Sequence, residues 1–533
     1  MQPESTRCIP GTRVELLSTL VTWVKKDTAK GLLWLTGMTG TGKTSVAVTL
    51  CHMLDSDEDV LLGGAFLCSR TAHVEARTNV RRIIPTLAHL FAHQSPKFAV
   101  ELAAELNSTS IDSGLADQIG PLLQRPLTRL NSETRPIVFV VDALDECGNE
   151  RELTELLTAI AGINYDVNIK FILTSRPETH TLGKPILDEA QSDFLHLRMV
   201  EAAEVPKDIR FFINGAFAKE PFASPWYSDT DVTALATLSN GIWIFASTMV
   251  SYILGIESAM DRTDPLQATL AVTSEVQVVT EGMEPLQTTA AVETESHVAV
   301  GRRNRLQTAL VAVSVRAVRI GPLDAMYEFI LTQASGTAEA ESEEPRMIRD
   351  NLACVLAVRV QISVISLAEL LGRKVYALRQ SLIRLHAMVY VPAEDDEPGV
   401  RIIHASFADY LVDRADINLR VSVAHGDKIL AHGCLRVMQI GLHFNVSHSY
   451  SSYDPNLSEK PTSITPSLEY ACLRWVYHLS RLAETSFLAK DVDNIFRPRF
   501  LFWLEVMSVL GRVQYAAAML IVAAATVRCL ISW

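Results

Sequence analysis

The stretch WLTGMTGTGKTSVAV, Trp34–Val48, determines the fold expected for the first part of this chain. Residues Gly37–Thr44 spell G-x-x-x-x-G-K-T, in which glycines let backbone N–H groups turn inward around phosphate oxygens at the start of a helix. The pattern requires a strand before it and a helix after it, and apolar residues 31–37 and the periodic residues 45–54 satisfy that requirement. The sequence predicts a phosphate-binding loop formed by Gly37, Met38, Thr39, Gly40, Thr41, Gly42, Lys43, Thr44 and Ser45.

Two side chains of this loop have specific expected roles. Lys43 would reach the β and γ phosphates of a nucleotide, and the Thr44 hydroxyl would bind Mg²⁺. A short pattern with four fixed positions also arises by chance, so the interpretation depends on other strand ends in the chain.

A second strand end lies in PIVFVVDALDECG at 136–148, an apolar run that ends at Asp142. A carboxylate there can hold Mg²⁺ through water, and Asp145 or Glu146 just beyond it could orient an attacking water molecule. Taken alone, an apolar run that ends in aspartate is often only the end of a strand.

The third strand end is KFILTSRPE at 170–178, which delivers Thr174, Ser175 and Arg176 to the sheet edge where ligands bind in open α/β folds. Arg176 could neutralise charge on a γ-phosphate, or it could be a strand-end arginine bonded to carboxylates. Three such strand ends in this order predict binding of a nucleotide with Mg²⁺ and leave the base open, although the resemblance described below favours adenine, as ATP or ADP.

The alternation of short apolar runs with helical patterns up to about residue 200 predicts an α/β P-loop domain, with a parallel sheet and helices on both faces. Later patterns are helical, except that residues 365–412 show the order helix, helix, strand, turn, strand of a winged helix. The expected organisation is a lead-in helix at 1–30, the P-loop domain at 31–200, a helical domain at 201–257, a repeated low-aromatic insertion or linker at 258–320, a winged-helix domain at 321–415 and a helical domain at 416–533.

The repeated segment contains DPLQATLAV at 264, EPLQTTAAV at 284 and NRLQTALVAV at 304. Three copies of one unit could form a small stacked element. Because each copy has few large apolar residues to bury, we favour a weakly structured insertion between domains.

The composition indicates which kinds of binding partner and which cellular compartment to expect. The net charge of −13 opposes bulk attraction to nucleic acid or anionic membrane. The eight cysteines show no metal-binding spacing and read as reduced thiols, which indicates a cytoplasmic protein. The apolar stretch Val513–Val527 is short for a membrane span, so we expect a helix packed on protein, with membrane anchoring as the alternative.

The motifs at 37–44, 137–147 and 171–178 together resemble the NACHT group of STAND NTPases, in the fungal version grouped with nephrocystin-3-like N-terminal domains. Further marks of that group are CIPGTR at 8–13, GIWIFAS at 241–247, LDAMYEFIL at 323–331, HASFADYL at 404–411 and YACLRWVYHL at 470–479. The resemblance implies a molecular switch that holds ADP when closed, exchanges it for ATP, self-associates and signals to a protein effector.

The resemblance also implies roles for two more residues. A histidine of the winged helix contacts the ADP phosphate in that group, and His404 would match it. The alternative is that His404 is a half-buried histidine whose hydrogen bonds are made within its own domain. By the same resemblance, Thr12 and Arg13 are expected near the base or ribose; the alternative for Arg13 is a surface residue. The effector domain and sensor repeats of the family plan have no counterpart here, which fits a reduced regulator or an incomplete gene product.

The sequence gives less support to other classes of function. A second class is a P-loop kinase or a fast ATPase. Against a kinase, this sequence shows no arginine-rich lid or acceptor site, and the DALDE strand end favours water as the nucleophile. A scaffold that binds nucleotide without significant hydrolysis remains the main alternative. DNA binding by basic residues of 371–386 conflicts with the acidic charge of the chain. A catalytic triad of His404, Ser406 and Asp409 lacks a glycine elbow to expose the nucleophile.

Overall fold

The computed structural model describes residues 7–26, 31–69, 77–106, 114–130, 135–163, 169–179, 192–196, 204–219, 226–255, 287–336, 343–448, 463–482 and 486–528. The chain divides into two compact units. The N-terminal unit comprises Met1–Ile253 and Pro285–Leu323, and the C-terminal unit comprises Leu254–Glu284 and Asp324–Trp533. Each unit is considered by itself.

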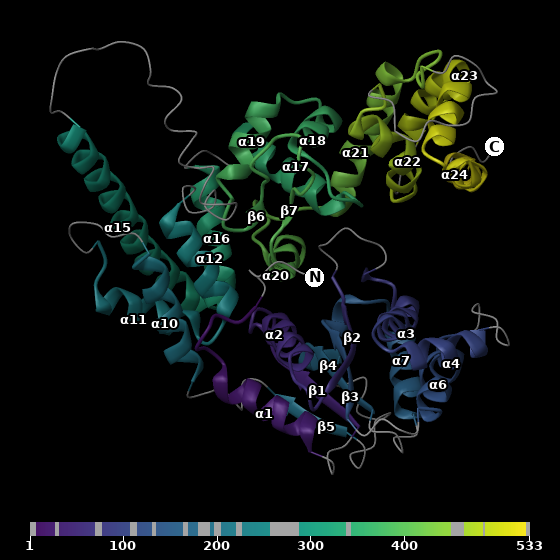
Figure 1. The fold of residues 1–533 in the computed structure, drawn as a ribbon. Coiled ribbons are helices and arrows are strands. Elements are labelled where there is room, and N and C mark those ends of the chain that lie inside the picture. Colours follow the sequence, from purple (N-terminus) through teal and green to yellow (C-terminus); the bar gives the residue numbers. More distant parts are fainter. Residues whose placement is uncertain are drawn as a thin grey trace. The chain divides into compact units, whose positions relative to one another are not determined.

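The N-terminal unit is built on a parallel sheet of five strands in the order β2-β3-β4-β1-β5 (Figure 1). The strands are β1 Leu32–Thr36, β2 Leu61–Leu67, β3 Ile137–Asp142, β4 Ile169–Ser175 and β5 Ser192–His196. Around them lie α1 Val14–Lys25, α2 Lys43–Asp55, α3 Ile83–Gln94, α4 Pro96–Leu106, α5 Leu115–Ile119, α6 Arg125–Thr128 and α7 Glu150–Ala161. The predicted α/β P-loop fold is therefore confirmed.

Both faces of the sheet are buried, as the continuous apolar runs predicted. Alternate residues of a strand point to opposite faces, so Leu32 and Trp34 of β1 join the core beneath α3 and α7, while Leu33 and Leu35 join the core beneath α1 and α2. The two cores fix the strand register, and thereby align the carboxyl ends of β1, β3 and β4.

A buried lysine fastens α1 to this sheet. The Lys170 ammonium donates to the carbonyl oxygens of Val24 at 2.6 Å and Lys26 at 2.8 Å, and lies over the Trp23 ring. It therefore satisfies carbonyls that the helix end leaves without intrahelical partners. We expect Lys170→Met to lower the free energy of unfolding by about 2 to 4 kcal/mol.

Urea denaturation of the full chain measures this effect. The control is Lys25→Met, because Lys25 is exposed and pairs with the carboxylates of Asp57 and Asp59. Equal effects of the two substitutions would contradict the proposed anchoring role of Lys170.

Four more helices belong to the N-terminal unit: α10 Val205–Phe217, α11 Asp229–Ser239, α12 Trp243–Leu254 and α15 Gln287–Ile320. The weakly structured insertion that we favoured is wrong for residues 287–320, which form one helix of 34 residues. Its arginines bind the rest of the unit, because Arg303 Nε donates to the Trp226 carbonyl and Arg305 Nε to the Ile253 carbonyl. The first repeat, at 264–272, lies outside the described residues.

From Asp324 onward the C-terminal unit contains most of α16 Pro322–Ser335, followed by α17 Glu343–Ala357. Then come α18 Val364–Leu371, α19 Val375–Ile383, the antiparallel strands β6 Val389–Tyr390 and β7 Arg401–Ile402, and α20 Ala405–Asp409. The order helix, helix, strand, turn, strand matches the expectation for 365–412, while its assignment as a winged helix stays a prediction.

The chain continues with α21 Val423–Gly441, α22 Pro466–Ser480, α23 Ser486–Val509 and α24 Val513–Arg528. Helix α24 covers the apolar stretch singled out in the sequence and contacts α22 and α23. Among the described residues, no helix has both the length and the apolar character needed to cross a membrane.

A buried histidine joins α21 and α22. His478 shares hydrogen bonds with the Asp427 carboxylate at Nδ1 and with the Tyr470 hydroxyl at Nε2, both at 2.7 Å. Burial lowers the pKa of His478 below its ordinary value of 6.5, although Asp427 opposes the shift. As the pH falls below 6.5, the unfolded chain therefore takes up this proton before the folded chain does.

We accordingly expect stability to be independent of His478 above pH 6.5 and to fall below it, by up to about 1.4 kcal/mol per pH unit. Urea midpoints at pH 7.5 and 5.5 measure the effect. His478→Gln should flatten this dependence, whereas the exposed His52→Gln should leave it intact. The same slope in all three proteins would contradict the assignment.

Candidate functional site

The loop between β1 and α2 has the backbone that its glycines predict. Gly40 and Gly42 have φ values of +80° and +86°, a region that residues with a Cβ atom rarely adopt. Gly42 immediately precedes α2, so Lys43 and Thr44 occupy its first positions. The loop N–H groups are therefore at the positive end of a 13-residue helix.

Among the other loop residues, Met38 has an exposed side chain, and Thr39, Thr41 and Ser45 are half-buried. The Thr41 hydroxyl donates to the Met38 carbonyl at 2.8 Å. This local bond helps to hold the turn that carries Gly40.

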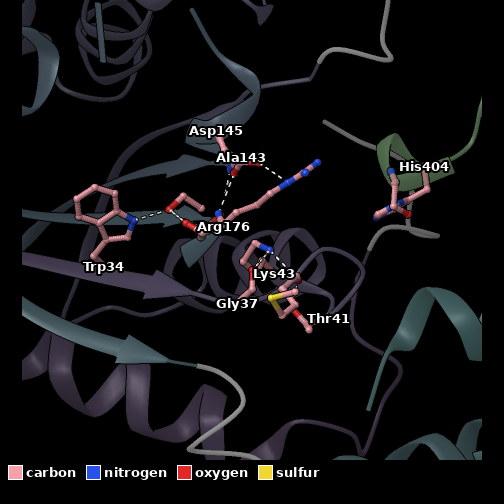
Figure 2. A network of polar contacts seen from close by, with 12 residues as sticks. Trp34, Gly37, Thr41, Lys43, Ala143, Asp145, Arg176 and His404 are labelled. Carbon is pink, nitrogen blue, oxygen red and sulfur yellow. Dashed lines mark hydrogen bonds and ion pairs between the residues drawn. The ribbon is translucent and has the colours of Figure 1, made fainter. Parts of the chain in front are cut away.

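Lys43 folds back over the loop that precedes it (Figure 2). Its ammonium donates to the carbonyl oxygens of Gly37 at 2.6 Å and Met38 at 3.0 Å. Burial lowers its pKa, and the carboxylates of Asp145 and Asp142 oppose this shift. Two of its three N–H donors are thus used by the loop, and the remaining one is available for an anion.

Asp142 is the last residue of β3 and is only 1% exposed. The Thr174 hydroxyl donates to its Oδ1 atom at 2.6 Å. Its Oδ2 atom is buried with no hydrogen-bond partner among the described residues. Burial raises the Asp142 pKa, while the nearby hydroxyls of Thr174 and Thr44 and the charge of Lys43 lower it.

Asp145 and Arg176 meet beyond the ends of β3 and β4 (Figure 2). The Arg176 backbone N–H donates to Asp145 Oδ1 at 3.1 Å, and Arg176 Nε lies 3.0 Å from Asp145 Oδ2. The alternative expectation for Arg176, a strand-end arginine bonded to carboxylates, therefore matches the geometry. Asp142, Asp145, Glu146 and Arg176 all act on the Lys43 pKa, so these charged groups share one edge of the sheet.

Arg13 is buried, so its interpretation as a surface residue is wrong. Its backbone N–H donates to the Asp208 carboxylate at 2.8 Å, and its guanidinium donates to the Thr41 carbonyl. The guanidinium carbon lies 5.4 Å from the centre of the Trp243 ring. Arg13 thus links α10 and α12 to the phosphate loop, while its role beside a base or ribose stays a prediction.

Residues Ile242–Ile244 contact the phosphate loop, which sequence reasoning missed. The Ile244 N–H donates to the Gly40 carbonyl at 3.0 Å. The Trp243 indole N–H is buried with no hydrogen-bond partner among the described residues. The only signal in the sequence was GIWIFAS itself, which the resemblance marked without giving it a position in space.

His404 lies in the C-terminal unit, immediately before α20. Its Nδ1 atom accepts the Ser406 N–H at 3.1 Å and lies 2.7 Å from the Ser406 hydroxyl, which in turn bonds Tyr327. Partners within its own unit therefore fix this half-buried ring. Its predicted contact with a phosphate stays a prediction.

A family model described as "Nephrocystin 3, N-terminal" matches residues 11–176 of this chain. The matched range contains the loop between β1 and α2 and extends to Arg176. It supports the resemblance to nephrocystin-3-like N-terminal domains. The NACHT grouping and the fungal type stay predictions. Comparison with curated protein sequences finds no match.

Solved structures with some similarity include the Aeropyrum pernix ORC1 protein in complex with DNA, at 14% identity and a TM-score of 0.26, covering 81% of this chain and 94% of that one. Cdc6p from Pyrobaculum aerophilum has 12% identity and a TM-score of 0.29, covering 81% and 97%. Drosophila ORC bound to GC-rich DNA and Cdc6 has 12% identity and a TM-score of 0.23, covering 96% and 70%. Similarity at this level supports no conclusion about the function of this chain.

Proposed function

We propose that this chain binds ATP and ADP with Mg²⁺ and acts as a STAND-type molecular switch with slow hydrolysis, in signalling or innate-immunity-like regulation. The observation that carries nucleotide binding is the unpartnered Oδ2 atom of Asp142, buried beside the phosphate loop. A buried acceptor without a partner is costly, and a cation near Thr44 would satisfy it. The unpartnered Trp243 indole N–H offers a donor for the same ligand.

The charged residues have complementary roles in this proposal. Lys43 and the loop N–H groups would bind the phosphates, and the Thr44 hydroxyl and Asp142 would hold Mg²⁺. When bound, Mg²⁺ supplies charge neutralisation on the β and γ phosphates. Arg176 adds a second positive charge close enough to lower the Lys43 pKa. Together with Mg²⁺, these cations would offset the carboxylates of the edge and the charge of the phosphates.

The Asp145–Arg176 pair supports slow hydrolysis. Each carboxylate oxygen of Asp145 faces a donor of Arg176, so the pair holds Asp145 in place and weakens it as an acceptor toward a water molecule. Glu146 is the other candidate for that role. If the Asp145–Arg176 pair never separates, the second candidate function is favoured, which is a scaffold that binds nucleotide without significant hydrolysis.

The switch itself rests on the resemblance and is consistent with a chain of two compact units. In this proposal, exchange of ADP for ATP leads to self-association and binding of a protein effector in the cytoplasm. The chain has no excess of basic residues that would favour nucleic acid as the partner.

Extraction of bound nucleotide from the purified full chain tests the proposal. We expect ADP in the wild type, and Lys43→Ala to weaken affinity by about tenfold to a hundredfold, because a charge-assisted contact is lost. Lys25→Ala is the matched control, since Lys25 is exposed and pairs with surface carboxylates. A wild-type chain that binds neither ATP nor ADP in the presence of Mg²⁺ would refute it.

A further inference from the structure

Two exposed histidines lie together on α3, apart from the phosphate loop. His89 and His93 are four residues apart, so they share one face of the helix. Their Nε2 atoms are 3.2 Å apart, and the ring centres are 4.5 Å apart with the planes at 84°. The two Nε2 atoms are therefore within hydrogen-bond distance of each other, and a metal ion would replace the proton shared between them.

The separation of the two nitrogens matches a shared metal ion. With metal–nitrogen bonds of about 2.0 to 2.1 Å, two nitrogens 3.2 Å apart subtend roughly 100° to 106° at the metal, between the angle of about 90° in a tetragonal site and about 109° in a tetrahedral one. The histidine χ2 torsion is broad, so small ring rotations can direct both lone pairs to that position without moving the backbone.

The helix beneath the pair is held firmly. Phe91 lies between the two histidines in sequence, is 1% exposed, and packs on Phe98 and Phe139 with ring centres 4.8 Å and 6.1 Å apart. Leu87 is fully buried in the same core. The two ligands are thus attached to an already ordered helix, so binding costs little conformational entropy.

We propose that His89 and His93 form a chelating site for a borderline transition-metal ion, with Cu²⁺ bound more tightly than Ni²⁺ or Zn²⁺. Imidazole suits these ions, whereas Mg²⁺ prefers oxygen ligands, so this site is distinct from the one at Asp142. No group of three or more metal-binding side chains occurs in the described part of the chain. Water would complete the coordination, which makes the site open and its metal exchangeable.

The test is titration of the full chain with CuCl₂ in excess Mg²⁺, followed by electron paramagnetic resonance. We expect one equivalent of Cu²⁺ whose spectrum shows coupling to two nitrogens. His89→Gln and His93→Gln should each weaken this binding by roughly tenfold or more, because the second imidazole acts as an intramolecular ligand at high effective concentration.

The control is His52→Gln, which replaces an exposed histidine on α2 and should leave Cu²⁺ binding unchanged. Thermal unfolding without metal should give the same midpoint for all four proteins, because the replaced side chains are exposed. The proposal is overturned if the spectrum shows fewer than two nitrogens, or if only one of the two α3 substitutions weakens binding.

Discussion

Replacing Gly40 with alanine is expected to abolish nucleotide binding. Gly40 has a φ of +80°, and a Cβ atom added there would lie 2.2 Å from Ile244 Cγ2. The positive φ alone costs about 1 to 2 kcal/mol for a residue with a side chain. The overlap forces either the loop or residues 242–244 to move, and a displaced loop loses the inward N–H groups that would hold phosphate. Calorimetric titration with ADP measures the loss.

Two further variants separate the steric effect from the backbone effect. Ile244→Ala in the Gly40→Ala background removes the overlapping methyl group, so affinity should recover in part. Gly511→Ala serves as the control, because Gly511 also has a positive φ, of +64°, but no atoms lie near its Cβ position. It should leave ADP affinity unchanged. A double variant that binds no better than Gly40→Ala would show that the Ile244 contact does not matter.

The second large effect is expected for Asp142→Asn, which should increase the stability of the protein without nucleotide and decrease its ATP hydrolysis. Asparagine keeps an acceptor for Thr174 but removes a buried carboxylate whose pKa burial raises. We expect the free energy of unfolding without nucleotide to increase by about 1 kcal/mol. Mg²⁺-dependent ATP hydrolysis should fall by about a hundredfold or more, because a charged ligand for Mg²⁺ is lost.

Stability is measured by urea denaturation in EDTA, hydrolysis by phosphate release with Mg²⁺ and ATP, and ATP affinity by calorimetric titration with and without Mg²⁺. The matched control is Asp145→Asn, which breaks the pair with Arg176 but leaves Asp142 intact. It should preserve the Mg²⁺ dependence of ATP affinity. A destabilised Asp142→Asn protein with normal Mg²⁺ dependence would contradict the assignment of Asp142 as a metal-binding carboxylate.

Much of the site could be predicted because the carboxyl ends of parallel strands all lie at the same edge of the sheet. Asp142 ends β3 and Arg176 follows β4, and these strands are neighbours, as are β4 and β1 before the phosphate loop. Apolar runs mark such strands directly in the sequence. The sequence left open which group each charged side chain contacts. Arg176 could have paired with a phosphate or with a carboxylate, and in the structure it pairs with Asp145.

The interpretation of the repeated segment failed for a physical reason. Few large apolar residues suggested too little burial for stable structure, yet α15 buries Leu306, Ala309 and Val313 and also binds its unit through arginine side chains. Arg303 and Arg305 donate to backbone carbonyls 77 and 52 residues away. Hydrogen bonds of that kind leave no periodic pattern of apolar residues from which they could be predicted.

The sequence by itself determined the strands of the sheet and the glycine turn between β1 and α2, because these depend on local pattern and glycine conformation. Only the tertiary structure decided that Arg13 is buried against the loop, that Ile244 contacts Gly40, and that Asp142 keeps an unpartnered oxygen. These features join residues that are far apart in the chain. They depend on packing between elements, which no single stretch of sequence encodes.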